Sequence, residues 1–576
     1  MRMASKNRRQ HLQSLKQHYY DLVIIGGGIT GAGIALDAVS RGLKVALIEK
    51  QDFASGASSR STKMIHGGLR YLQKLQLKTV AKTGRERAML YENAPHVIMP
   101  EKMLLPIHKG GSLGRFTTSI GLKVYDYLAG VKQGEKRVML SRQEVLEKVP
   151  AIKVDGLRGA GEYVEYRADD ARLTLEIIKK ASELGADCYN YLEAERFNCD
   201  AQGYVEGVLV KDGFSGNHYL VEGSIVLNAT GAWMYDLMPV EAKEGLNVNL
   251  IKGAHIVFDQ SVLPLREIVY FDTGAEKKMV FAVPRGNKVY VGVSSAIYHG
   301  KRETPTVSET DIQYLLTALN EMFPALKLTK DQVESSWAGM TAVCKESTKS
   351  KGHKPLLQTA GNGLMTVMAG KLTGYRELAE SVVDEIAGRL KVTRGLEFSP
   401  CQTQTLRVSG ADVGGSDQFP AFIERKIAEG IKANLTESEA RALATMYGAN
   451  VDDLFEIAST ASPDEMQGLP LMLYVKLMYG LKHESVMTPA DFWLRRTSDL
   501  YFNIEYMQTH HVNVTRFMAR YFSWSAEAVK QFNSEVEVAL YQATHPVEDA
   551  GVVKLSLKES GISNQDSQMP AERVEK

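Results

Sequence analysis

The sequence contains few cysteines and no long apolar run, and its charges nearly cancel. Its four cysteines are scattered without a CxxC pair, which excludes a zinc-site spacing and predicts reduced thiols in a cytoplasmic protein without a metal. No uninterrupted apolar stretch approaches the roughly 20 residues that cross a bilayer, so any membrane contact would be peripheral. Lys and Arg total 69 against 68 Asp and Glu, a net charge of +1. We therefore expect no nucleic-acid partner.

The two ends of the chain differ from its middle. Residues 1–20 carry five Lys and Arg and no acid, but they lack the apolar core of a secretory signal. We expect a basic lead segment that forms a short helix; a cleaved segment and a basic arm that touches anionic lipid remain alternatives. The polar tail at 549–576 is poor in aromatic residues, which predicts disorder.

The middle of the chain is long enough for several domains. Apolar strands flank a glycine turn and a small-residue helix over 21–49, which indicates a βαβ unit. Short strands alternate with turns over 204–231, and a Gly-Asn turn joins two β-rich arms in MVFAVPRGNKVYVGVSS. A strand, glycine turn and long helix recur at 363–390, and 416–545 is one helical pattern after another. Glycines among basic and aromatic residues between about 108 and 165 predict an irregular insertion.

The first glycine turn has the spacing of a dinucleotide site. Gly26, Gly28 and Gly31 form a GxGxxG motif between a strand and a helix, where they allow a tight turn, close approach to a pyrophosphate and helix packing. The helix N-terminus would face the phosphates. Glu49 lies 21 residues after Gly28 at the end of the second strand, where a carboxylate can accept hydrogen bonds from the ribose hydroxyls. The motif alone does not separate FAD from NAD.

The run GASSRSTKMIHGGLRYL at 56–72 distinguishes FAD from NAD, because it resembles a sequence of a known flavoprotein family. With EYRADDARL, NATGAW, KGAHIVFD, SSWAG, GKLTGYRELAE and PADFWLRRT, the sequence resembles the FAD-dependent glycerol-3-phosphate dehydrogenases, within the D-amino-acid-oxidase-like flavoproteins, over nearly the whole chain.

The resemblance implies an α/β fold. A Rossmann-like FAD-binding domain and an antiparallel-sheet substrate domain would interleave over 21–399, followed by an all-α C-terminal domain at 400–548. We assign the FAD-binding parts to about 21–107, 165–235 and 356–399, and the substrate parts to about 108–164 and 236–355.

The cofactor would be FAD, held by residues beyond the first turn. Hydroxyls and unshielded amides that suit phosphate and flavin contacts are Ser58, Ser59, Ser61, Gly67 and Gly68. Thr230 and Gly231 end a strand that would approach the cofactor. Gly370, Leu372 and Thr373 begin a helix whose positive end would face the flavin.

The family activity is the oxidation of sn-glycerol 3-phosphate to dihydroxyacetone phosphate by hydride transfer to FAD, with electrons passed to a membrane quinone. This implies a small phosphate substrate, a role in glycerol catabolism and peripheral contact with the inner face of the cell membrane; a homodimer remains open. Candidates for substrate binding are Arg70, Tyr71, Arg285 and Lys371. Candidates for catalysis are His255 and His66 as proton acceptors, with Arg70 and Lys371.

Three segments depart from the family pattern. After SSWAG the family continues Leu-Arg-Pro-Leu, but here Thr341 replaces the arginine. The family's Thr-Thr-Asp-Thr is VSSA at 293–296, and the first glycine of Gly-Gly-Lys-Leu-Thr is Ala369. Losing one charged phosphate contact costs roughly 1.5 to 3 kcal/mol. The missing arginine therefore leaves two alternatives open: an enzyme for another hydroxy or amino substrate, and an FAD protein with little turnover. An oxidase that uses O2 is a third, independent alternative.

Overall fold

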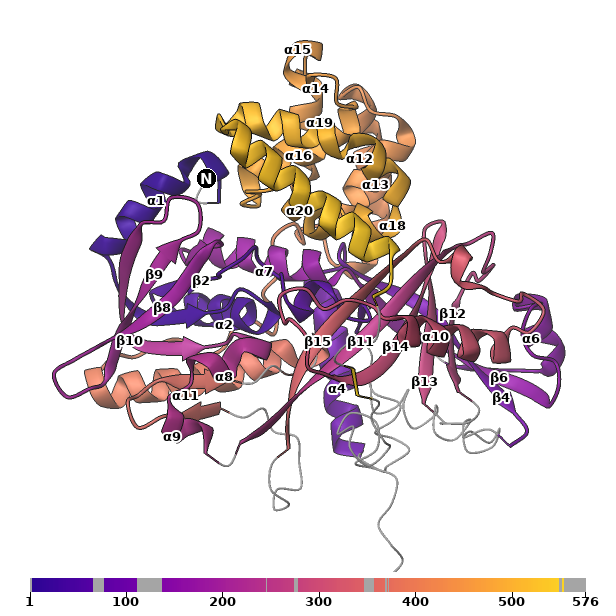
Figure 1. The fold of residues 1–576 in the computed structure, drawn as a ribbon, viewed down its shortest axis with the longest axis horizontal. Coiled ribbons are helices and arrows are strands. Elements are labelled where there is room, and N and C mark those ends of the chain that lie inside the picture. The colour runs from indigo at the N-terminus through magenta and orange to yellow at the C-terminus, as the bar shows by residue number, and fades with distance from the viewer. Residues whose placement is uncertain are drawn as a thin grey trace, which may run out of the picture.

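The computed structural model describes residues 3–65, 77–110, 137–244, 246–273, 278–345, 357–367, 370, 372–547 and 552–553 (Figure 1). These residues form two sheets with their covering helices and a helical region that stands on one side of both. The fold is therefore α/β with an all-α C-terminal region, as the sequence predicts. The domain boundaries stay a prediction.

The first sheet is built on parallel strands from distant parts of the chain. Its order is β16-β17-β10-β1-β2-β7, and β9 and β8 extend it beside β10. The strands are β1 (Tyr19–Ile25), β2 (Val45–Ile48), β7 (Asp187–Tyr189), β8 (Leu192–Cys199), β9 (Val205–Asp212), β10 (His218–Asn228), β16 (Leu357–Thr359) and β17 (Met365–Val367). Helix α2 (Ile29–Ser40) packs against both α7 (Asp170–Glu183) and α11 (Tyr375–Arg394). The predicted βαβ unit, the strands at 204–231 and the strand–helix step at 363–390 are confirmed.

The second sheet is largely antiparallel, in the order β15-β11-β14-β13-β12-β4-β6-β3. Its strands are β3 (Met64–Ile65), β4 (Ile98–His108), β5 (Val138–Leu140), β6 (Leu157–Ala168), β11 (Asn247–Asp259), β12 (Ile268–Asp272), β13 (Met279–Arg285), β14 (Lys288–Tyr298), β15 (Ser335–Lys345) and β18 (Val552–Val553). Helices α4 (Leu77–Asn93), α6 (Arg142–Lys148) and α10 (Glu309–Met322) accompany it. The predicted hairpin is β13–β14.

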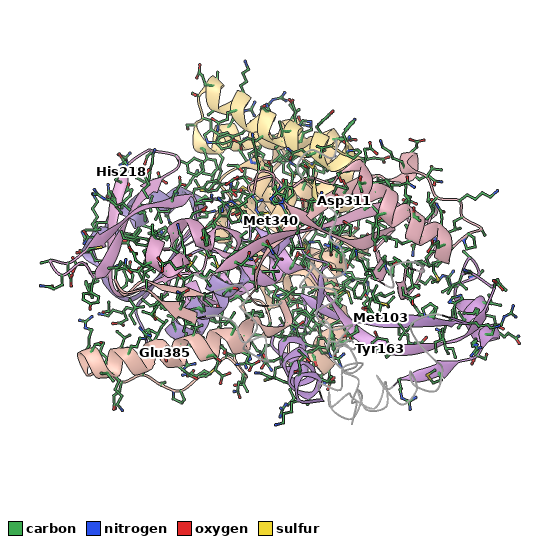
Figure 2. All side chains as sticks on the ribbon, turned by 60° about the horizontal axis from the view of Figure 1, so that its bottom comes forward. Met103, Tyr163, His218, Asp311, Met340 and Glu385 are labelled. Carbon is green, nitrogen blue, oxygen red and sulfur yellow. The ribbon has the colours of Figure 1, made fainter. Side chains whose placement is uncertain are left out.

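One expectation for this sheet was wrong. An irregular insertion was expected between about 108 and 165, but β6 is a twelve-residue strand paired along its length with β4. Residues 111–136 of that insertion lie outside the described part of the chain. Met103 and Tyr163 face each other across that pair, and the Tyr163 hydroxyl donates to the Met103 sulfur at 3.0 Å (Figure 2). Within β6, Gly159 lies against the Leu140 carbonyl, where a Cβ would come within 2.3 Å. Close strand packing, not irregularity, explains that glycine.

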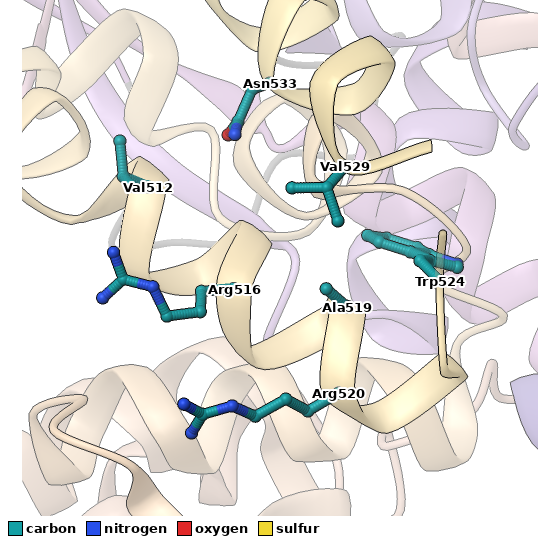
Figure 3. A pocket seen from close by; sticks show the side chains of 7 residues that line it. All are labelled: Val512, Arg516, Ala519, Arg520, Trp524, Val529 and Asn533. Atoms are coloured by element: carbon teal, nitrogen blue, oxygen red, sulfur yellow. The ribbon is translucent and has the colours of Figure 1, made fainter. Parts of the chain in front are cut away.

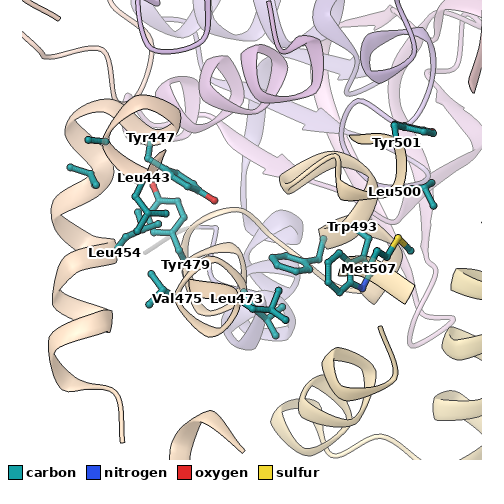
Figure 4. Packing of buried hydrophobic residues seen from close by; sticks show 14 of the residues in the cluster. Leu443, Tyr447, Leu454, Leu473, Val475, Tyr479, Trp493, Leu500, Tyr501 and Met507 are labelled. Carbon is teal, nitrogen blue, oxygen red and sulfur yellow. The ribbon is translucent and has the colours of Figure 1, made fainter. Parts of the chain in front are cut away.

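The C-terminal region consists of short helices around a common core. They are α12 (Phe419–Lys432), α13 (Glu437–Tyr447), α14 (Val451–Thr460), α15 (Pro463–Met466), α16 (Leu471–His483), α17 (Pro489–Asp491), α18 (Asp499–Phe502), α19 (Ile504–Phe522) and α20 (Ala526–Thr544). Tyr447, Tyr479 and Trp493 are among its buried residues (Figure 4). A π-helical turn, Phe492–Arg496, interrupts the predicted helix over TPADFWLRRTSDLYF.

The basic lead segment forms α1 (Arg8–Ser14), flanked by two 3₁₀ turns, so the predicted short helix is confirmed. Leu12 and Leu15 are buried against the first sheet. Arg8 pairs with Asp212 at 2.8 Å. The remaining elements are α8 (Met234–Leu237) and α9 (Val240–Lys243). Within the described ranges, no helix combines the length and apolar character that crossing a membrane requires.

Candidate cofactor and substrate site

The glycine turn lies where β1, β2 and β10 end. Gly26 has φ +117°, and its amide donates to the Ile48 carbonyl at 2.8 Å. A Cβ on Gly26 would lie 2.6 Å from the Ala229 oxygen, and one on Gly31 would lie 1.9 Å from the Gly26 oxygen. Both positions therefore require glycine. A Cβ on Gly28 would lie 3.0 Å from the Ser58 hydroxyl, a tight contact, and, chain neighbours apart, Ser58 alone among the described residues comes within 4 Å of it.

Glu49 follows β2 and lies against the same turn. Its Oε2 accepts from the Gly27 amide at 2.8 Å, and its Oε1 accepts from the Gln51 amide at 2.9 Å. Burial raises the pKa of this carboxyl. Each oxygen keeps a second lone pair that can accept from a hydroxyl, so the glycine turn and the acid beside it fit the pyrophosphate and adenosine ribose of FAD.

The serines after this turn hold the protein's own backbone. The Ser58 hydroxyl accepts from the Ile29 amide at 2.9 Å, at the start of α2. Ser61 donates its amide to Asp170 Oδ2 at 2.9 Å, and its hydroxyl accepts from the Lys63 amide at 2.9 Å. The Ser59 carbonyl accepts from the Lys63 ammonium at 3.0 Å. The structure therefore brings Ser58 to the predicted phosphate site, while the Ser61 hydroxyl is engaged in a local turn.

A buried ion pair that the sequence did not predict fixes the same loop. Lys63 Nζ lies 2.6 Å from Asp170 Oδ1, and both side chains are buried. The indole nitrogen of Trp337 donates to the Ser61 carbonyl at 3.3 Å, and a Cβ on Gly339 would lie 2.3 Å from the Arg60 carbonyl oxygen. Residues of both the EYRADDARL and the SSWAG segments therefore contact the loop at 58–63 and hold it in place.

His255 faces this loop from β11. Its Nε2 lies 3.1 Å from the Thr62 hydroxyl, and its ring stacks on Trp337 with centroids 4.8 Å apart. A Cβ on Gly292 would come within 2.1 Å of the imidazole. Burial, with a smaller contribution from the Lys63 charge, lowers the pKa of His255 to about 3. The ring is therefore neutral at physiological pH.

Arg285 lies at the end of β13 and turns toward the helical region. Its Nη2 lies 2.8 Å from Asp169 Oδ2, and its guanidinium covers the Phe502 ring at 4.1 Å. Asp169 also caps α7 by accepting from the Arg172 amide at 3.0 Å. Burial raises the pKa of Asp169, but the charges of Arg285 and Lys63, with the hydrogen bond from the Arg172 amide, lower it to about 2. This arginine is thus already paired where three parts of the chain meet.

Some of the other predicted residues are described by the structure, and the rest lie outside its described part. Thr230 binds Asn228 through its hydroxyl at 2.7 Å, and Gly231 has φ +58°, directly beside the glycine turn. Gly370, Leu372 and Thr373 precede α11, and the 3₁₀ turn Leu372–Gly374 contacts both β3 and α4. The predicted residues outside the described part of the chain are His66, Gly67, Gly68, Arg70, Tyr71 and Lys371, together with Ala369.

Thr341 is exposed on β15, opposite Ile251 of β11, whereas its neighbour Met340 is buried (Figure 2).

A separate hollow of about 340 Å³ lies between α19 and α20. Arg516, Arg520, Trp524 and Asn533 are among the residues around it (Figure 3). None of its lining residues belongs to the glycine turn or to either sheet, so it is not part of the candidate cofactor site.

Two family models match the chain. Residues 21–376 match the FAD dependent oxidoreductase family, and residues 401–529 match the C-terminal domain of alpha-glycerophosphate oxidase. An aerobic glycerol-3-phosphate dehydrogenase from Staphylococcus aureus (strain MRSA252) is 47% identical over 543 residues, which cover 93% of this chain and 97% of the relative.

Solved structures agree with these matches. A glycerol-3-phosphate dehydrogenase from Bacillus halodurans complexed with FAD has a TM-score of 0.82 and 40% identity, covering 95% of this chain and 100% of that one. An L-alpha-glycerophosphate oxidase from Mycoplasma pneumoniae with FAD bound shares the fold at a TM-score of 0.53 and 17% identity, covering 68% of this chain and 98% of that one. The chain belongs to the family of FAD-dependent glycerol-3-phosphate dehydrogenases.

Proposed function

We propose that this protein oxidises sn-glycerol 3-phosphate to dihydroxyacetone phosphate. The observation that carries the proposal is 47% identity over 93% of the chain to an aerobic glycerol-3-phosphate dehydrogenase. Bound FAD would supply the hydride acceptor for this oxidation. The glycine turn and Glu49 would hold its pyrophosphate and adenosine ribose, with Thr230 and Gly231 beside them.

The described residues divide the remaining work. A base with a pKa near 3 matches a proton acceptor at neutral pH poorly, so His255 is better suited to orient Thr62 than to take the substrate proton. Arg285 already neutralises Asp169 and serves to join the sheet to the helical region. The proton acceptor and the phosphate ligands would then come from His66, Arg70, Tyr71 and Lys371, whose roles stay predictions.

Product identification tests the substrate. Purified protein loaded with FAD would be incubated with sn-glycerol 3-phosphate and an artificial electron acceptor, and dihydroxyacetone phosphate would be quantified by a coupled enzyme. We expect turnover with this substrate and little with glycerol, which lacks the phosphate, or with sn-glycerol 1-phosphate, which has the opposite configuration. Equal turnover of glycerol would contradict recognition of the phosphate.

The electron acceptor is a separate proposal. We expect a quinone, and with it peripheral contact of a cytoplasmic protein with the inner face of the membrane, either as a monomer or as a homodimer. The alternative acceptor is O2, and the observation behind it is the match of residues 401–529 to the C-terminal domain of alpha-glycerophosphate oxidase. Peroxide release at the rate of product formation would identify an oxidase, whereas reduction of a soluble quinone with little peroxide would identify a dehydrogenase.

Thr341 offers a test of the altered substrate region. If an arginine at this position reaches the phosphate, Thr341→Arg should lower the KM for sn-glycerol 3-phosphate by about ten- to a hundredfold, since a charged contact contributes roughly 1.5 to 3 kcal/mol. Thr341→Gln, of similar length without the charge, should leave the KM within about twofold. An unchanged KM in both variants would show that a side chain at position 341 does not reach the phosphate.

A further inference from the structure

A buried cluster of charges joins the helical C-terminal region to the loop that follows β2. Arg495 Nε donates to Asp52 Oδ2 at 2.5 Å, and Arg496 donates to both oxygens of the same carboxylate, at 2.6 and 2.8 Å. Its eight buried members balance four acids against four bases: Asp52, Glu176, Glu484, Asp491, Arg172, Lys179, Arg495 and Arg496.

Asp52 also receives a hydrogen bond from Asn190, the residue that follows β7 of the first sheet. Asn190 donates its amide to Asp52 Oδ1 at 3.0 Å and to the Ser485 carbonyl at 2.9 Å. The two guanidiniums lower the pKa of Asp52 to about 2 although the carboxyl is fully buried. The carboxylate therefore stays charged and has a fixed position and orientation.

The residues beside Asp52 touch the glycine turn. The Ala54 amide donates to the Gly27 carbonyl at 3.0 Å. Phe53 is fully buried, and a Cβ on Gly27 would lie 2.8 Å from its ring. Glu49, three residues before Asp52, accepts from the Gly27 amide. The segment 49–54 thus meets the cofactor turn at both ends and is anchored in between by the C-terminal region.

The use of charge at this anchor calls for a reason beyond stability. Burying an ion pair costs desolvation free energy, a cost that apolar side chains of similar volume do not carry. A carboxylate that is hydrogen-bonded to two guanidinium groups nevertheless has a defined distance and angle to them, which apolar packing does not provide. An anchor of this kind is suited to a loop whose exact position matters.

We propose that Arg495 and Arg496 are positioning residues for the cofactor, which act through Asp52 to hold segment 49–54 against the glycine turn where the adenosine end of FAD binds. The C-terminal region would then contribute to FAD affinity without touching FAD. The inference rests on FAD binding and is independent of which substrate is oxidised.

The test measures FAD affinity in variants of the anchor. FAD would be titrated into apoprotein and the dissociation constant read from flavin fluorescence, with the thermal midpoint of the apoprotein recorded in parallel. Arg496→Gln and Asp52→Asn should each weaken FAD binding by about tenfold or more, because a charge-assisted bond that fixes the loop is lost. Both substitutions break the same contact. The FAD dissociation constant of the double variant should therefore lie within about twofold of that of the weaker-binding single variant.

A matched control separates positioning from general loss of stability. Lys252→Gln breaks another buried ion pair, between Lys252 and Asp311 at 2.5 Å, whose partners lie on β11 and α10. It should lower the thermal midpoint while the FAD dissociation constant stays within about twofold of wild type.

Arg495→Lys provides a milder change for the case in which Arg496→Gln does not fold. It keeps the charge but loses the guanidinium geometry, so hydrogen exchange of the amides at 49–54 should quicken and FAD should bind more weakly. Folded anchor variants with lower thermal midpoints, unchanged FAD affinity and unchanged exchange at 49–54 would overturn the proposal. Failure to oxidise glycerol 3-phosphate would leave it standing.

Discussion

The glycine turn and the charge cluster hold the same segment by opposite means. The turn uses backbone amides, missing side chains and one acid, so that Gly31 packs on the Gly26 carbonyl and Glu49 accepts two amides. The cluster on the other side uses full charges on long side chains from the helical region. The side that faces the ligand must stay open, whereas the side that faces the protein can be filled.

This difference teaches which kind of change each region tolerates. A turn defined by close backbone contact fails when a single methyl group is added. A balanced cluster of buried charges tolerates small changes of volume but fails when one charge is removed, because its partner is left unpaired in a medium of low dielectric constant. The predictions that follow exploit this contrast, from the largest expected effect to the smallest.

Adding a methyl group to the turn should abolish cofactor binding. In Gly31→Ala the new Cβ would lie 1.9 Å from the Gly26 oxygen, so the turn must open at a cost of about 4 kcal/mol or more, the range of severe single substitutions. We expect purified protein without bound flavin, measured as the ratio of flavin absorbance to protein. Gly388→Ala, in α11 with open space around it, should bind FAD normally. Full flavin content in Gly31→Ala would show that the turn is not the cofactor site.

Removing one charge from the cluster should destabilise the whole protein. Glu484→Gln removes a negative charge that neutralises the fully buried Arg172. We therefore expect the free energy of unfolding, measured in urea, to fall by about 3 to 5 kcal/mol. Lys330→Gln breaks an exposed pair with Glu309 and should cost less than about 1 kcal/mol. Similar losses in the two variants would mean that the cluster is not specially important for stability.

The two regions also differ in how far the sequence alone could predict them. The glycine turn is local: Gly26 to Glu49 carry their spacing within one βαβ unit, and the strands and helix follow as predicted. The charge cluster is not local, since Asp52 and Arg496 are 444 residues apart and no spacing connects them. The segment PADFWLRRT supported the family resemblance, but its π-helical turn and the two buried arginines are visible only in three dimensions.

The same distinction applies within the candidate site. Gly28, Glu49, Thr230 and Gly231 lie together because the strands that precede them end at one edge of a parallel sheet. Ser58 joins them from the loop after β2, and the roles of these residues in binding FAD stay predictions. The position of His255 was predicted, but its neutral state depends on Trp337 stacked on one face and on Lys63 nearby, which come from other elements.

The buried histidine should give the protein a measurable pH dependence of stability. Burial lowers the pKa of His255 from 6.5 to about 3, so the unfolded chain binds a proton that the folded protein does not, and stability falls as the pH drops from about 6.5 toward 3. One such group contributes a slope of about 1.4 kcal/mol per pH unit. His255→Gln should reduce the slope of unfolding free energy against pH by that amount between about pH 6 and 4.

The control for this measurement is Gln202→Asn, at an exposed residue whose side chain does not titrate, which should leave the slope unchanged. The same slope in His255→Gln and in the wild type would contradict a neutral buried His255.

Replacing the acid beside the turn should have the smallest effect. Glu49→Gln keeps one carbonyl oxygen but turns an amide NH2 toward a backbone donor, either Gly27 or Gln51. Losing one such hydrogen bond and a ribose acceptor should weaken FAD binding by about 1 to 2 kcal/mol, measured by titration of the apoprotein. Glu193→Gln, at an exposed position on β8, is the control. Unchanged affinity in Glu49→Gln would place the ribose elsewhere.

The most direct test of the whole account is an anaerobic titration of the FAD-loaded protein with sn-glycerol 3-phosphate. The oxidised-flavin absorbance would be followed as substrate is added. We predict that it is lost rapidly and stoichiometrically, with dihydroxyacetone phosphate as the product. A flavin that stays oxidised under saturating substrate, while dithionite reduces it normally, would contradict the proposed activity.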